Sequence, residues 1–294
     1  MSDISNFEHA TCNLCGHDDI SLLYRVNPVR RNHNGEFNLV KCRQCGLIYT
    51  NPRPDSKAIL SYYPENYEYH EVRNASFLEK LYYRYFRRIP DIKKGTVLDV
   101  GCGNGNYLYF LKINGWDCYG TEINDLMIDR MVNKLGLKIF KGELYNIDFQ
   151  ERYFDVITFW GSLEHMSDPS KVLEKTYKLL KVGGKVIIWL NNIESFEARV
   201  FKRYWHHLEV PTHYYQFSPA TLTNLLKCNK FKIEKVRFDI ISFGIVPSIG
   251  YILNKKYNIN MNTNKLILKL IFMPLDILLS FFKNSGLITI YATK

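Results

Sequence analysis

The chain has 294 residues, of which 46% are hydrophobic and 23% charged, as expected for a soluble globular protein. Its length suits one large domain, or one domain with a small module. The formal net charge of +10 fits acidic partners such as nucleotide-linked substrates, anionic lipid surfaces or nucleic acid, although many cytosolic proteins are mildly basic. The N-terminus shows no basic-then-apolar signal pattern, and no run of about 20 uncharged apolar residues predicts a spanning helix.

Four of the seven cysteines form two matching motifs near the N-terminus, Cys12/Cys15 in "CNLCG" and Cys42/Cys45 in "KCRQCG". Two-residue spacing lets both thiolates of a pair reach one metal, and two pairs supply a closed tetrahedral zinc site. A redox-active pair is the competing interpretation, but both motifs share the same glycine, which favours zinc. Four thiolates leave no open position, so the predicted zinc is structural. Residues 1–55 form this zinc-ribbon module, with a hairpin between the motifs.

The odd number of cysteines and the absence of a signal pattern indicate reduced thiols in a cytosol.

Residues 56–95 form a linker and helix. The linker segment "SYYPENYEYHEV" is rich in tyrosine, and "SFLEKLYYRYFRRI" follows as a helix with a capping box of Ser76 and Glu79. The spacing of its apolar residues predicts one buried face, formed by Leu78, Leu81, Tyr82, Tyr85 and Phe86. This helix either packs against the main domain, which we favour, or closes over a ligand.

Residues 96–294 begin with "TVLDVGCGNGN", a short buried strand, a glycine turn and a helix that ends at Gly115. Further elements follow in alternation: strands over 116–122, 137–142, 154–160 and 185–191, and helices over 124–136 and 168–184. Alternating strands and helices predict an α/β fold with a doubly wound, Rossmann-like parallel sheet.

Two features of this opening separate the possible cofactors. A dinucleotide fingerprint has glycine at its sixth position, whereas here Gly101, Gly103 and Gly105 are followed by Asn106. The strand also ends in Asp99, whose carboxylate would repel a pyrophosphate but attract the ammonium group of S-adenosylmethionine. Glu122 ends the second strand, where a carboxylate accepts hydrogen bonds from ribose hydroxyls.

The segment "VLDVGCGNGNYLYFLKINGWDCYGTEIN" resembles the first motifs of class I S-adenosylmethionine-dependent methyltransferases. The segment "YFDVITFWGSLEHMSDPSKVLEKTYKLLKVGGKVIIWLNN" is similar to their fourth-strand, helix and fifth-strand motifs, and "SPATLTNLLKCNKFKIEKV" and "GLITIYATK" to the elements of strands six and seven. The resemblance therefore implies a seven-stranded, mostly parallel sheet. The N-terminal motifs and tyrosine-rich linker resemble a subgroup with an N-terminal zinc ribbon, often associated with sugar or surface-glycan modification.

The resemblance implies S-adenosylmethionine as cofactor and assigns binding roles by position. The methionine end would lie against Asp99, Gly101, Gly103 and Gly105, with Gly161 beside it. Glu122 and Ile123 would hold the ribose and one adenine face. Glu143 stands where the family places an acid or amide near the adenine amino group, although a solvated loop charge is an equal alternative.

Methyl transfer to a hydroxyl or carbon acid needs a general base, and His165 and His213 are the candidates. His165 follows the fourth strand and can instead be a lid or structural residue. An acceptor pocket is predicted from Trp205, His206, His207, Tyr214 and Tyr215; the alternative is an aromatic loop packed on the sheet. Quinone-biosynthesis O-methyltransferases carry a metal-binding "E-x-x-E-H" motif. Here Gly161 replaces its first glutamate, so no catalytic metal is predicted.

A helical insertion over about 243–284 precedes the last strand. Its apolar segment 265–283, predicted to break at Pro274, either contacts a membrane surface, covers the acceptor site or joins two copies. The predicted protein is a cytoplasmic, or membrane-peripheral, methyltransferase acting on a sugar nucleotide, surface glycan or lipid-linked intermediate. The alternative is a nucleic-acid methyltransferase or binding protein, disfavoured because no dense basic tract and no "[DN]-P-P-[YFW]" motif occur. Neither the acceptor atom nor the oligomeric state follows from the sequence.

Overall fold

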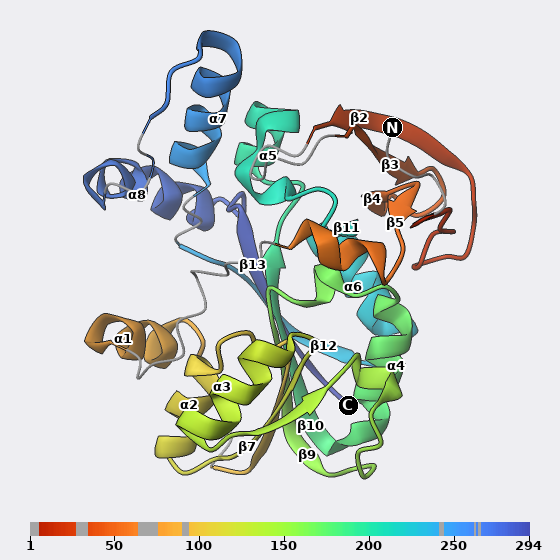
Figure 1. Cartoon of the computed structure of the whole chain (residues 1–294), viewed down its shortest axis with the longest axis vertical. Helices are drawn as coiled ribbons and strands as arrows, with labels where there is room; N and C mark the ends of the chain where they lie inside the picture. Colours follow the sequence, from red (N-terminus) through yellow and green to blue (C-terminus); the bar gives the residue numbers. More distant parts are fainter. Residues whose placement is uncertain are drawn as a thin grey trace. The chain divides into compact units, whose positions relative to one another are not determined.

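The computed structural model describes residues 6–27, 35–63, 76–89, 94–240, 244–261, 263 and 266–294. The predicted tyrosine-rich linker from residue 64 onward and Lys265 of the predicted apolar segment lie outside the described residues. The chain divides into two compact units, which are described separately (Figure 1). The cysteine unit comprises Met1–Glu65, Leu190–Leu225 and Val236–Thr289, and the glycine-loop unit comprises Asn66–Trp189, Leu226–Lys235 and Ile290–Lys294. The domain boundaries expected from the sequence stay a prediction.

A seven-stranded sheet has the strand order β12-β13-β10-β9-β6-β7-β8. Its strands are β6 (Thr96–Val100), β7 (Asp117–Glu122), β8 (Lys138–Lys141), β9 (Phe154–Trp160), β10 (Leu180–Asn191), β12 (Lys232–Phe238) and β13 (Leu287–Thr293). Strand β6 pairs in parallel with β7 and with β9, β7 pairs in parallel with β8, and β9 with β10. The predicted α/β fold with a mostly parallel seven-stranded sheet is confirmed, including the last two strands.

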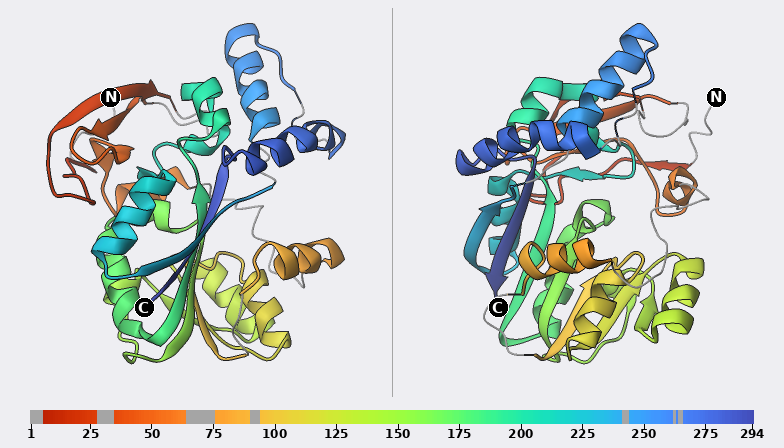
Figure 2. Two further views of the ribbon diagram at one scale, coloured as in Figure 1. Left: turned by 180° about the vertical axis from the view of Figure 1, so that it is seen from behind. Right: turned by 90° about the vertical axis from the view of Figure 1, so that its left-hand side faces the viewer.

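Helices cover both faces of the sheet, with α2 and α3 on one face and α4 on the other (Figures 1 and 2). Their bounds are α2 (Asn106–Ile113), α3 (Asp125–Leu135) and α4 (Pro169–Leu179), with short 3₁₀ helices η4 (Leu144–Asn146) and η5 (Leu163–His165) between them, and α6 (Pro219–Cys228) before β12. Side-chain oxygens of Asn124 and Asp168 cap α3 and α4 by accepting main-chain N–H groups.

The core of the glycine-loop unit lies between α2, α3 and the sheet. Val97 and Val156 from adjacent strands pack with Leu108 and Leu111 of α2 and Met131 of α3, all of them buried. Strands of a parallel sheet that is buried on both faces have continuous apolar sequences, and these strands could therefore be predicted from the sequence.

Helix α4 is shorter than predicted, because it ends at Leu179 and not at residue 184. Leu180 already has extended backbone angles and pairs with Phe154 of β9. The strand then bulges between Leu180 and Lys185, with Gly183 at a φ of +76°. A residue with positive φ cannot continue a right-handed helix, so Gly183 and the following Gly184 belong to the irregular start of β10 and not to α4.

Helix α1 (Phe77–Tyr85) begins with the predicted capping box, in which Ser76 and Glu79 each accept the other's main-chain N–H. Its predicted apolar face is wrong in part. Leu78 is 74% exposed and Tyr85 66%, whereas Tyr83 is buried. The reason is that Tyr83 packs on two rings of α2, which turns the helix away from the face inferred from periodicity.

The cysteine unit contains a four-stranded sheet with the order β11-β4-β3-β2. Its strands are β2 (Ile20–Val26), β3 (Phe37–Cys42), β4 (Ile48–Thr50) and β11 (Tyr215–Gln216), and a separate pair joins β1 (Phe7–Glu8) to β5 (Arg53–Pro54). Shorter helices are η2 (Ala58–Tyr62), α5 (Phe196–Phe201), η6 (Lys202–Tyr204) and η7 (His206–Leu208). The antiparallel β2–β3 pair confirms the hairpin expected between the cysteine motifs.

The insertion before β13 contains α7 (Ile245–Tyr257) and α8 (Leu266–Phe281), which are neighbours in both views of Figure 2. The predicted break at Pro274 is wrong, because α8 runs through it. Proline removes one backbone donor, but half-buried Phe272 and buried Leu279 anchor the turns on either side. No helix in the described part of the chain is long and apolar enough to cross a bilayer.

Candidate functional site

The loop between β6 and α2 needs glycine at three positions. Gly101, Gly103 and Gly105 have φ values of +69°, +58° and +71°, which L side chains rarely adopt. A Cβ on Gly101 would lie 2.8 Å from the Cβ of Ser162, and one on Gly105 would lie 2.6 Å from the Sδ of Met131. The loop therefore presents backbone, not side chains, to a ligand.

Asp99 is a buried carboxylate directly before this loop, with 3% of its surface exposed. One of its oxygens accepts a hydrogen bond of 2.7 Å from the hydroxyl of Thr158 on β9. Burial raises the pKa of Asp99 to about 7, and the Glu122 charge adds to this, while the Thr158 hydrogen bond and the Arg87 charge oppose it. A cation that reached this carboxylate would stabilise its ionised form.

Glu122 lies at the carboxyl end of β7 and lines the other side of the loop. Its Oε1 accepts from the main-chain N–H groups of Ile123 and Asn124 at 2.8 and 3.1 Å, and its Oε2 accepts from that of Gly103 at 3.0 Å. Burial raises its pKa, and these three N–H groups partly offset the rise. The side chain is thereby fixed in place, with about one acceptor site left for a hydroxyl donor. The neighbouring Ile123 is 44% exposed, so its apolar side chain is available to contact the flat face of a nucleobase.

Glu143 precedes η4, is half-buried and belongs to a small hydrogen-bonded group. Its two carboxylate oxygens accept from the hydroxyl of Ser167 at 3.3 and 3.0 Å, and that hydroxyl also lies 3.1 Å from the Tyr145 hydroxyl. Burial and the hydrogen bond to Glu143 raise the pKa of Tyr145.

Gly161 ends β9 with a φ of +69°, and its N–H donates to the Trp189 carbonyl at 2.8 Å. The next residue, Ser162, donates its hydroxyl to the Val100 carbonyl, which ties the β9 end to the β6 end. His165 follows in η5 and is half-buried, with its main-chain N–H donated to the Ser162 carbonyl at 3.1 Å. The glycine turn and the hydroxyl thus fix where η5 starts.

Arg87 is a functional candidate that the sequence analysis missed. Its guanidinium lies 5.0 Å from the ring of Trp160 and 5.6 to 5.8 Å from four other rings, those of Tyr82, Tyr83, Tyr107 and Trp189. The positive charge of Arg87 also acts to lower the pKa of Asp99. Its Nε is buried with no hydrogen-bond partner in the described part of the chain. The only sequence signal was the basic pair Arg87-Arg88 among aromatic residues.

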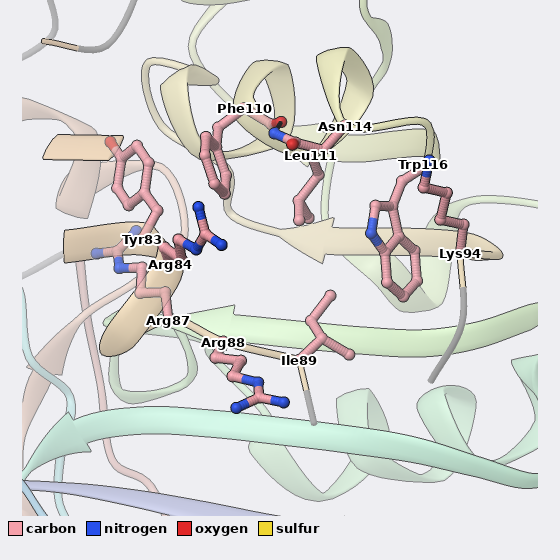
Figure 3. Close-up of a pocket in the computed structure, with 10 residues that line it drawn as sticks. All are labelled: Tyr83, Arg84, Arg87, Arg88, Ile89, Lys94, Phe110, Leu111, Asn114 and Trp116. Atoms are coloured by element: carbon pink, nitrogen blue, oxygen red, sulfur yellow. Dashed lines mark hydrogen bonds between the residues drawn. The ribbon is translucent and has the colours of Figure 1, made fainter. Parts of the chain in front are cut away.

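A cavity of about 660 Å³ lies beside this arginine, between α1 and α2 (Figure 3). Its lining contains four basic residues, Arg84, Arg87, Arg88 and Lys94, and three aromatic rings, those of Tyr83, Phe110 and Trp116. Packing of α1 against the main domain was the favoured prediction. In the structure, α1 leaves an opening that is lined by basic and aromatic side chains.

The second histidine candidate, His213, belongs to the cysteine unit and is buried. Its Nδ1 lies 3.4 Å from the Nδ2 of Asn191, whose amide also donates to the His207 carbonyl at 3.2 Å. Because one amide hydrogen of Asn191 points at the His207 carbonyl, the other amide hydrogen faces Nδ1 of His213. In the neutral ring the proton then resides on Nε2.

The predicted acceptor pocket is wrong for three of its aromatic residues. Trp205, Tyr214 and Tyr215 are each 2% exposed. Buried Arg53 donates to the Tyr215 hydroxyl at 2.9 Å and lies 4.6 Å from the Tyr214 ring, while Trp205 donates to Glu197. These three residues are core of the cysteine unit, whereas His206 and His207 are half-buried.

A family model described as a methyltransferase domain matches residues 70–236, more than half of the chain. The chain belongs to the class I S-adenosylmethionine-dependent methyltransferases. S-adenosylmethionine is the cofactor of this family, and the loop fits it, because a buried acid beside glycine backbone suits a cationic amino acid end.

The methyltransferase is 30% identical to a tRNA U34 carboxymethyltransferase of Campylobacter fetus subsp. fetus over 158 residues, which are 52% of this chain and 55% of the relative. It is 28% identical to a ubiquinone biosynthesis O-methyltransferase of Coxiella burnetii, over 40% of this chain and 52% of the relative. The chain thus spans about half the length of the curated relatives it matches.

Solved structures support the fold. A SAM-dependent methyltransferase from Archaeoglobus fulgidus is 23% identical, with a TM-score of 0.53, and the match covers 78% of this chain and all of that one. The [4+2]-cyclase SpnF is 16% identical, with a TM-score of 0.50, and the match covers 79% of this chain and 85% of that one. At these identities the likeness concerns the fold alone.

The four N-terminal cysteines of the methyltransferase lie together, with all four sulfur atoms within 4.8 Å of one another. The Sγ atoms of Cys12 and Cys45 are 3.3 Å apart, and those of Cys15 and Cys42 are 3.6 Å apart, close to the edges of a zinc–thiolate tetrahedron. Both turns are alike, since Gly16 and Gly46 have φ values of +77° and +79°. Burial raises the pKa of Cys12 and of Cys45, whereas main-chain N–H groups of Cys45 and Gln44 bring the pKa of Cys42 below its usual value. The donor set therefore fits a zinc ion.

Proposed function

We propose that the protein transfers a methyl group from S-adenosylmethionine to a small-molecule or glycan-type acceptor: a sugar nucleotide, a surface glycan or a lipid-linked intermediate. The observation that carries the proposal is the pair of carboxylates, Asp99 and Glu122, on either side of a positive-φ glycine loop. A buried acid at the strand end disfavours a pyrophosphate and favours a cationic ligand.

The proposed cofactor contacts follow from the charges of the site. The zwitterionic methionine end would place its ammonium at Asp99 and its carboxylate at the free nitrogen of Arg87, beside Gly101, Gly103, Gly105 and Gly161. One ribose hydroxyl would donate to the remaining acceptor site of Glu122. When bound, S-adenosylmethionine supplies an activated methyl group and its own leaving group, so the chain mainly positions the two reactants.

The adenine would lie on Ile123, with its amino group donating to Glu143. The Ser167 hydroxyl already orients that carboxylate, so little reorganisation is required on binding.

An acceptor that loses a proton needs a base, and we propose His165 or His213 for this role. The Nδ1 of His213 faces the Asn191 amide, so this nitrogen could take up a proton only by losing that contact. His165 is therefore the better base, and His213 the better positioning group.

A structural zinc ion held by Cys12, Cys15, Cys42 and Cys45 is part of the proposal, as is a cytoplasmic location that keeps these thiols reduced. The ion would hold the open end of the β2–β3 hairpin, because the first motif precedes β2, the second begins at the last residue of β3, and Ile20 pairs with Cys42. Four thiolates leave the ion no open position for an acceptor.

A nucleic-acid acceptor is the second candidate. The likeness to a tRNA U34 carboxymethyltransferase, the four-cysteine cluster and the +10 charge favour it. The absence of a dense basic tract and of a "[DN]-P-P-[YFW]" motif favours the small-molecule or glycan class instead.

We expect the protein to release S-adenosylhomocysteine when it is supplied with sugar-nucleotide or lipid-linked glycan acceptors, and not with tRNA or DNA. Product release measured by mass spectrometry over these acceptor classes tests the proposal. The variants His165→Ala and His213→Ala, assayed across pH, then separate a base from a positioning group. Turnover on RNA alone, with gel shifts that survive physiological salt, would reverse the ranking of the two functions.

Replacing Arg87 by leucine should weaken S-adenosylmethionine binding about tenfold to a hundredfold, because a charge-assisted hydrogen bond to the cofactor carboxylate is lost. Titration calorimetry measures this loss. The control is Arg88→Leu, since Arg88 is exposed and is the next residue in the chain. Equal affinities of wild type and Arg87→Leu would remove Arg87 from the site.

A further inference from the structure

Helix α8 and the residue after it carry an exposed apolar surface, here called the α8 apolar face. It consists of Leu270, Ile271, Ile277, Leu278, Phe281 and Phe282. Ile271 is 63% exposed and Phe281 79%. Single exposed apolar residues are ordinary, but a continuous group of this kind marks an interaction surface.

The spacing shows that this surface is one side of the helix. Exposed residues recur three or four positions apart, at 270, 274, 278 and 281. Leu279 and Asp276, on the other side, are buried. The single acidic side chain of α8 is therefore directed away from the α8 apolar face, which contains no charge of its own.

Positive charge accompanies this surface. Residues 244–283 contain five lysines and one aspartate, and that aspartate is the buried Asp276. Lys255 and Lys256, at the end of α7, and Lys283, after α8, are exposed. Tyr257 and Ile259, next to the first two lysines, are also exposed, at 65% and 52%. Lysines beside an apolar face are the composition of helices that lie in the interface of an anionic bilayer.

We propose that the α8 apolar face docks on an anionic membrane surface, with α8 lying in the headgroup region. The 16 residues of α8 are fewer than the about 20 that a spanning helix needs, which fits a helix that lies on the bilayer. A second copy of the chain is the less suitable occupant, because a symmetric contact would bring like-charged lysines toward each other. The acceptor class that follows, a lipid-linked glycan intermediate, rests on the proposed function, whereas the docking itself does not.

The test is co-sedimentation of the full chain with vesicles of phosphatidylcholine alone or mixed with phosphatidylglycerol. We expect binding to the mixed vesicles at low salt, weaker binding at physiological salt, and little binding to phosphatidylcholine alone. The double variant Ile271→Glu/Phe281→Glu should lower the ratio of bound to free protein at least about tenfold. The matched control is Val182→Glu on β10, a change at a residue that is 82% exposed, and it should bind as wild type.

Thermal melts check that each variant is folded, and titration with S-adenosylmethionine in the same preparations separates the two proposals. Wild type that binds the cofactor but stays in the supernatant with every vesicle overturns the docking and leaves the proposed function standing. Vesicle binding without cofactor binding does the reverse. A dimer seen by light scattering and abolished by the double variant, without vesicle binding, would assign the α8 apolar face to a second copy.

Discussion

The affinity for S-adenosylmethionine should fall as the pH decreases below about 7, because burial raises the pKa of Asp99 to about 7. Only the ionised carboxylate attracts the ammonium of the cofactor, so each pH unit below this pKa should cost up to about tenfold in affinity. The variant Asp99→Asn should bind about a hundredfold more weakly above this pKa and lose the pH dependence. Calorimetry of both proteins across this range measures the two slopes.

The same carboxylate gives a stability effect of known sign. The pKa of Asp99 in the folded protein lies above its usual value of 3.8, so ionisation of Asp99 costs folding free energy. That cost is absent below the unfolded pKa, grows as the pH rises from about 4 to about 7, and is constant above. Without cofactor, Asp99→Asn should therefore be the more heat-stable protein at neutral pH. A variant that loses both affinity and stability would indicate a folding defect and contradict the assignment.

The elements of the glycine-loop unit were predictable from the sequence because local signals and burial agree there. Val97 and Leu98 form a short apolar run before three glycines, and no other residue type suits their positive φ values. The end of α4 was not predictable, because Leu180 leaves the helix to pair with Phe154, a residue 26 positions earlier in the chain.

Contacts between distant parts of the chain explain the remaining differences. Tyr214 and Tyr215 were expected at an acceptor pocket, but both are buried and pack against Arg53. No local sequence pattern links residues that are 160 positions apart. Arg87 was missed for the same reason, since its five aromatic neighbours come from α1, α2, β9 and β10. The apolar sequence of α8 would look the same on a buried helix, so only the structure shows which side is exposed.

Removing the metal from the four-cysteine cluster should unfold at least the β2–β3 hairpin. Two cysteines precede β2 and Cys42 ends β3, so without a shared ion the two cysteine turns are held mainly by main-chain hydrogen bonds such as those of Gly16 and Gly46. Structural zinc binding contributes about 10–16 kcal/mol in small zinc modules, which is more than the stability of a typical domain. Metal analysis, thermal melting and limited proteolysis of Cys42→Ser measure the effect.

The matched control is Cys228→Ser, which removes an exposed cysteine that lies outside the cluster. Wild type and this control should carry about one zinc per chain and melt alike, whereas Cys42→Ser should lose the metal and be cleaved between residues 12 and 45. Folded wild type without zinc, or equal melting of all three proteins, would show that the sulfur cluster holds no structural ion. Cofactor binding in the metal-free protein would then report how far the glycine-loop unit folds without the cysteine unit, because Asp99 and Glu122 both lie in the glycine-loop unit.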